Sequence, residues 1–171
     1  GEGEIHPGRA GSLMTDAARS GRRPMAVCVT VDVEFDIAGT FRYPDRCMPV
    51  SRQAVEYASS SGEHGLGFLL DCLKQHQAKA TFFVEVLNAA FFGADEMRRH
   101  AERIVESGNV LGLHLHPCWE LFGRPDWREH LRRSGPPKDT LCGEPQERAV
   151  ETLLKAKELF RGWGLGAPLA V

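Results

Sequence analysis

The chain has 171 residues, of which 42% are hydrophobic, and a formal net charge of -2. This length and composition suit one globular domain with a sizeable core. The near-neutral charge gives no electrostatic reason to expect binding to nucleic acid or to an anionic membrane surface. No stretch reaches the roughly 18 apolar residues of a membrane span. The five cysteines are odd in number and lack paired short spacings, which favours a reducing compartment over a disulfide framework.

The first 24 residues are rich in Gly, Arg and Ser and show no hydrophobic periodicity. We expect residues 1–24 to be a disordered or extension segment. No basic start followed by an apolar segment is visible in them, so the sequence predicts a cytoplasmic protein without a signal peptide. The folded domain is expected to span residues 25–171.

Strands and helices alternate along that domain. A β-branched apolar run predicts a buried strand at 26–32, and leucines at helical spacing predict a helix at 65–77. The elements expected after these are a strand at 80–84, a helix beginning near Asp95 and ending at Gly108, a strand at 110–116, a helical turn at 127–132, a helix at 146–161 with Val150, Leu153, Leu154 and Phe160 inward, and the start of a fourth strand at 167–171. This order predicts an α/β fold with a parallel sheet.

Acidic and histidine residues follow two of these strands. Asp32 and Glu34 lie at the end of the first apolar run, and His114 and His116 at the end of the third strand. Side chains alternate along a strand, so each pair shares a face. In parallel sheets, functional residues gather where the strands end. Carboxylates and imidazoles at that edge predict a divalent metal site, with Zn²⁺ as the first choice and Co²⁺, Ni²⁺ or Mn²⁺ also compatible.

Three segments together resemble the polysaccharide deacetylases, the carbohydrate esterases built on the NodB homology domain. They are Thr30-Val31-Asp32-Val33-Glu34, Lys79-Ala80-Thr81-Phe82-Phe83-Val84, and the run from Glu106 to His114. Their order and spacing agree with that family over residues 25–171. The resemblance implies a distorted (β/α) barrel, present only in part in this chain, that removes acetyl groups from an acetylated polysaccharide or amino sugar.

The resemblance also implies roles for individual residues. Asp32 would be the catalytic base, and Glu34 and His114 would be metal ligands. The usual spacing of the two histidines would pair His114 with Cys118, whereas this sequence offers His116, so the second ligand is His116 or alternatively Cys118.

Two residues next to these motifs are candidates for contact with the acetylated carbohydrate substrate, namely Glu85 and Trp119. The chain stops where the family's next motif would begin, so the resemblance predicts that this chain alone is inactive. Two alternatives remain open. One is another amidohydrolase on the same barrel, such as a ureide hydrolase, and the other is a degenerate domain that binds glycan or metal without turnover.

Overall fold

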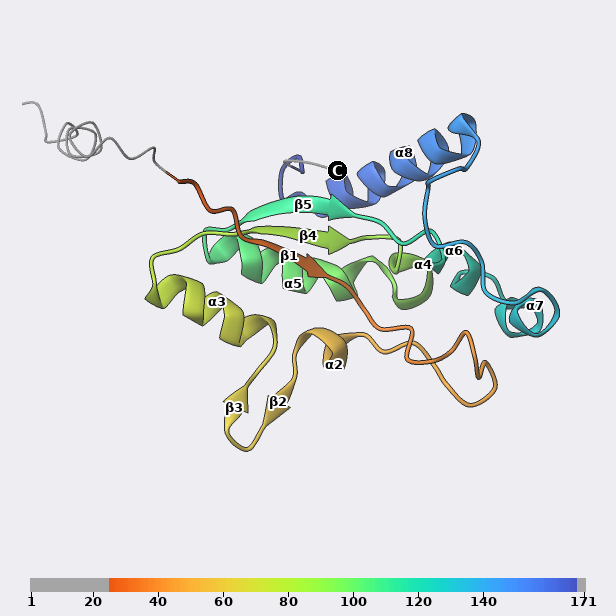
Figure 1. The fold of residues 1–171 in the computed structure, drawn as a ribbon, viewed down its shortest axis with the longest axis horizontal. Coiled ribbons are helices and arrows are strands. Elements are labelled where there is room, and N and C mark those ends of the chain that lie inside the picture. Colours follow the sequence, from red (N-terminus) through yellow and green to blue (C-terminus); the bar gives the residue numbers. More distant parts are fainter. Residues whose placement is uncertain (1–24, 169–171) are drawn as a thin grey trace, which may run out of the picture.

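The computed structural model describes residues 25–168, so the predicted segment 1–24 lies outside the described residues. At the centre is a three-stranded parallel sheet in the order β1-β4-β5, formed by β1 (Thr30–Val33), β4 (Thr81–Glu85) and β5 (Val110–His114) (Figure 1). Helix α3 (Leu66–Gln75) connects β1 to β4, and α5 (Ala94–Glu106) connects β4 to β5. Both helices lie on the same side of the strands in Figure 1. The predicted α/β class with a small parallel sheet is confirmed.

The register of the sheet aligns the ends of its strands. Val84 of β4 pairs with Val33 on one side and with Leu113 on the other. The next residue, Glu85, pairs with His114. Glu34 follows the last residue of β1, so it comes to the same edge of the sheet.

A central part of the hydrophobic core is formed by the sheet and α5. Phe82 and Val84 of β4 are completely buried, as are Met97, Ala101 and Ile104 of α5. Their spacing explains both elements, because alternate residues of a strand and every third or fourth residue of a helix point to one face. Burial of each large side chain contributes about 1.5–3 kcal/mol, so this layer fixes the sheet firmly.

The other elements of the described part of the chain range from strands of two residues to a helix of 17 residues. They are α2 (Arg52–Val55), the hairpin of β2 (Ala58–Ser59) and β3 (Gly62–Glu63), α4 (Ala89–Phe92), α6 (Trp119–Phe122), α7 (Trp127–Ser134) and α8 (Gln146–Gly162). The helices predicted at 65–77, 127–132 and 146–161 thus exist, with small shifts of their ends. None of the helices within residues 25–168 is long and apolar enough to cross a membrane.

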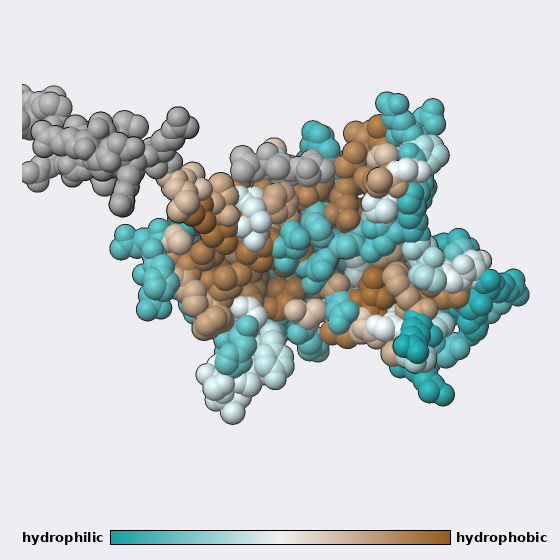
Figure 2. Space-filling model, viewed as in Figure 1, coloured by the Kyte–Doolittle hydropathy of each residue, from teal (hydrophilic) through white to brown (hydrophobic). Residues whose placement is uncertain are grey.

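The first strand is shorter than predicted. The sequence predicts a buried strand from residue 26, but the strand begins at Thr30, and Met25, Val27 and Val29 are 87%, 76% and 40% exposed. Figure 2 shows hydrophobic residues at the surface over this segment and β1. In the described residues β1 pairs with β4 on one edge only, and beyond its end Asp36 forms a single antiparallel bridge with Val50. Because β1 has a neighbouring strand on one edge alone in this part of the chain, the residues at the start of the apolar run, before Thr30, remain exposed to solvent.

The buried face of α8 agrees with the prediction at Phe160 but differs from it at Val150 and Leu154. The helix buries Thr152, Ala156 and Phe160, whereas Val150 and Leu154 are 45% and 56% exposed. Apolar residues occur on two faces of this helix, each at a spacing of four, so periodicity alone did not select the packed face. Residues 167–168 form no strand, and residues 169–171 of the predicted fourth strand lie outside the described part.

A buried histidine on α5 gives the fold a predicted dependence on pH. His100 is 2% exposed and packs edge-on against the ring of Phe35. Glu56 Oε1 lies 3.3 Å from His100 Nδ1 but without hydrogen-bond geometry, so no partner within residues 25–168 satisfies that nitrogen. Burial lowers the pKa of His100; the charge of Glu56 raises it, and those of Arg103 and Arg52 lower it further. The folded protein therefore favours the neutral ring.

Acid should therefore destabilise the protein through His100. Because its folded pKa lies below the unfolded value of about 6.5, the stabilisation is complete above that pH and is lost as the pH falls further. The free energy of unfolding should drop by up to about 1.4 kcal/mol per pH unit for this one proton. Urea unfolding between pH 7.5 and 5 measures the slope. His100→Phe should flatten it, and substitution of the exposed His76 by Gln should not; equal slopes in both variants would contradict the assignment.

Candidate metal centre

The carboxyl edge of the sheet brings together one carboxylate and two imidazoles. Glu34 Oε2 lies 3.3 Å from His114 Nε2 and 2.6 Å from His116 Nε2. The two Nε2 atoms are 3.0 Å apart. One potential ligand atom from each of the three residues lies within 4.8 Å of the other two. The structure thus groups three of the predicted ligands, although they come from two segments about 80 residues apart in the sequence.

The donor set fits a divalent transition metal. Two imidazole nitrogens and one carboxylate oxygen are ligands that Zn²⁺ accepts, and three protein ligands are typical of catalytic zinc sites, where a further position is open to water or substrate. All three side chains are partly exposed, so an ion from solvent can reach them. Glu34, His114 and His116 are therefore the residues that would hold the ion.

Cys118 occupies a different environment from His116. It is completely buried, and it does not belong to the group formed by Glu34, His114 and His116. Burial raises the pKa of the Cys118 thiol, and the nearby charge of Asp139 raises it further, so the thiolate that binds metal is disfavoured. The geometry favours His116 over Cys118 as the metal ligand that accompanies His114.

A carboxylate that the sequence does not identify as part of the site lies next to His116 and supports its assignment as a metal ligand. Asp139, between α7 and α8, accepts a hydrogen bond from His116 Nδ1 at 2.8 Å and one from the backbone N–H of Cys118 at 3.1 Å. The bond to Asp139 raises the pKa of His116 to about 9, against the opposing effect of burial. Burial raises the pKa of Asp139, but the bonds from His116 and Cys118 outweigh it and leave that pKa below its usual value. Asp139 lies in a polar, proline-containing stretch with no motif, so nothing in the local sequence could identify it.

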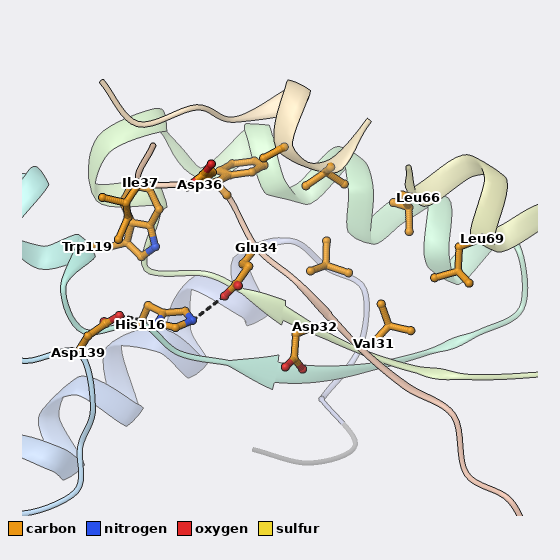
Figure 3. Close-up of a pocket in the computed structure, with 14 residues that line it drawn as sticks. Val31, Asp32, Glu34, Asp36, Ile37, Leu66, Leu69, His116, Trp119 and Asp139 are labelled. Atoms are coloured by element: carbon orange, nitrogen blue, oxygen red, sulfur yellow. Dashed lines mark hydrogen bonds and ion pairs between the residues drawn. The ribbon is translucent and has the colours of Figure 1, made fainter. Parts of the chain in front are cut away.

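A cavity of about 520 Å³ adjoins the cluster. Its lining combines a polar part with an apolar part, and Figure 3 shows Glu34, His116 and Asp139 together on one side, with Leu66 and Leu69 at the opposite end. Trp119, one of the predicted substrate contacts, also lines it. The residues around the metal ligands thus leave room for a small organic group.

Asp32 lies on the cavity wall, two residues before Glu34. Its side chain is exposed, as is that of Glu34, whereas Val33 between them is buried, so the two carboxylates share a face as the sequence predicts. No hydrogen bond or ion pair joins Asp32 to the other lining residues (Figure 3). An exposed carboxylate without such a partner is available to accept a proton from a bound molecule.

Glu85 lies beneath the site and not on the cavity wall. It is completely buried, and its oxygens accept hydrogen bonds from the backbone N–H groups of Leu87 at 2.7 Å and Asn88 at 2.8 Å. A longer contact of 3.4 Å reaches the N–H of His116. Burial raises the pKa of Glu85 to about 7, although these hydrogen bonds oppose the shift. This buried position does not support the predicted contact with substrate. Instead, the hydrogen bonds of Glu85 connect the end of β4 to the segment that carries His116.

No protein-family model, curated protein or solved structure matches this chain. The likeness to polysaccharide deacetylases consists of short motifs and stays a resemblance. Function must therefore be inferred from the chemistry and geometry of the site.

Proposed function

We propose that this protein is a metal-dependent hydrolase that removes acetyl groups from an acetylated polysaccharide or amino sugar. The main support is the cluster of Glu34, His114 and His116, which lies beside an exposed Asp32 at the edge of a cavity. The deacetylase-like order of the motifs suggests the acetyl substrate. A distorted (β/α) barrel, to which the three parallel strands would contribute, belongs to the same proposal.

Each residue has a distinct role in this reaction. Glu34, His114 and His116 hold the cation. When bound, a divalent cation polarises the acetyl carbonyl and lowers the pKa of water to about 7. Asp32 accepts the proton of the attacking water. Water adds to the carbonyl carbon, and the proton that Asp32 took from it passes to the sugar nitrogen or oxygen as the bond to the acetyl group breaks, which yields acetate and the free amine or hydroxyl. Trp119, which is 1% exposed, forms part of the apolar wall of the cavity.

Zinc titration of the 171-residue chain tests the metal centre directly. Calorimetry should show one Zn²⁺ per chain. His114→Ala should weaken binding by more than about 100-fold, because even partners outside the ligand set are worth about 10- to 100-fold. His64→Ala removes an exposed histidine of the β2–β3 region and should bind as the wild type does. Wild-type protein that binds no Zn²⁺ would refute the site.

An assay of acetate release tests the reaction. Chelation should abolish the release of acetate from acetylated chitooligosaccharides or xylan, and added Zn²⁺ or Co²⁺ should restore it. Release that survives complete removal of metal would contradict the mechanism. Tight metal binding without turnover of any acetylated glycan would favour the non-catalytic alternative.

A further inference from the structure

The His116 ring is held between two carboxylates from opposite sides. Its Nε2 faces Glu34 Oε2 at 2.6 Å, and its Nδ1 lies 2.8 Å from Asp139 Oδ2 (Figure 3). The other oxygen of Asp139 accepts a hydrogen bond from the backbone N–H of Cys118. With both oxygens bonded, the Asp139 carboxylate cannot rotate without the loss of a hydrogen bond.

We propose that Asp139 is a positioning residue for the metal ligand His116. It keeps a proton on Nδ1, so that the lone pair of Nε2 points at the centre formed by Glu34 and His114. Ligating histidines commonly donate their second N–H to a carboxylate, which fixes the tautomer and makes the ring a better ligand. This inference rests on the proposed metal centre and adds a residue outside its ligand set.

The position of Asp139 gives this role a structural consequence. The residue belongs to the segment between α7 and α8, 23 residues after His116, and it also lines the cavity. It connects this segment to the metal ligands and, through Cys118, to the start of α6. Correct placement of the segment and full metal affinity should therefore depend on each other.

Zinc affinity and the tautomer of His116 test the proposal together. Asp139→Asn keeps an oxygen acceptor of the same size but removes the charge, so it should weaken Zn²⁺ binding by about 10- to 100-fold. Asp139→Ala should weaken it further. Asp126→Asn is the matched control, since Asp126 is an exposed carboxylate of the same region that pairs with Arg124. It should leave zinc affinity unchanged.

Nitrogen-15 NMR of the zinc-loaded wild type adds a measurement that needs no variant. It should show zinc on Nε2 of His116 and a proton on Nδ1. Zinc on Nδ1 would overturn the proposal even if both Asp139 variants failed to fold. Equal zinc affinity in wild type and Asp139→Asn would overturn it and leave the metal centre intact. A wild type that binds no zinc would refute both.

Discussion

Replacement of Asp32 by Asn should leave the zinc content of the protein unchanged and reduce acetate release by about 10²–10⁴-fold, the usual contribution of a general base. Asp32 does not belong to the cluster of potential ligands, and its carboxylate is exposed on the cavity wall. The amide that replaces it keeps the shape of the side chain but cannot accept the proton of water. Plasma emission spectrometry of the purified variant and a coupled acetate assay give the two quantities.

Glu34→Gln should fail in a different way. Its Oε2 lies 2.6 Å from His116 Nε2 and 3.3 Å from His114 Nε2, so loss of the negative charge should reduce metal affinity first and activity as a result. High concentrations of Zn²⁺ should restore part of the activity of Glu34→Gln and none of that of Asp32→Asn. Equal loss of metal from both variants would make Asp32 a ligand and not a base.

Asp36→Asn is a suitable control for both changes. Asp36 lines the same cavity and is exposed, but its Oδ1 accepts a hydrogen bond from the backbone N–H of Ala38 at 2.7 Å. An amide oxygen can accept the same bond. We expect near-normal metal content and activity, which would show that loss of charge from the cavity wall alone does not explain the effects at Asp32 and Glu34.

The sequence predicts the centre of the fold well because the signals there are local. The helix at Ala94–Glu106 and the strands on either side of it have an apolar period that matches their burial, and Gly108 ends the helix with a positive φ of 75°. The same periodicity predicts which residues share a face at the strand ends. Asp32 and Glu34, and likewise the two histidines, could therefore be assigned to one edge before any contact was known. The predicted strand over 110–116 is too long, however, because β5 ends at His114 and strand alternation does not extend to His116.

The remaining features depend on contacts between distant segments. The length of β1 is set by which neighbours pair with its edges, and the packed face of α8 by what lies opposite it. Asp139 contacts His116 only because the segment after α7 folds back over the strand ends. Glu85 is the last residue of its strand, as His114 is of β5, and only the direction of the chain after it turns its carboxylate to the backbone of Leu87 and Asn88. No local sequence pattern predicts these differences.

His116→Ala should abolish tight zinc binding, whereas Cys118→Ala should retain it. His116 lies two residues beyond the end of β5, yet its ring reaches Glu34 and His114, so its loss leaves one histidine and one carboxylate. Affinity should fall by more than about 100-fold, beyond the loss expected for a partner outside the ligand set. Alanine is the better replacement at Cys118, since a buried serine hydroxyl would need a hydrogen-bond partner.

The comparison of the two variants decides which side chain is the second ligand. Zinc titration should be accompanied by thermal unfolding with and without Zn²⁺, because a ligand that binds only the folded state raises the melting temperature. Cys118→Ala should lower the melting temperature of the metal-free protein through the cavity that it leaves, but should keep the rise caused by zinc. His116→Ala should lose that rise. If Cys118→Ala loses it and His116→Ala keeps it, the thiol must reach the metal after a rearrangement of the turn at Pro117, and the arrangement of the two histidines is not the functional one.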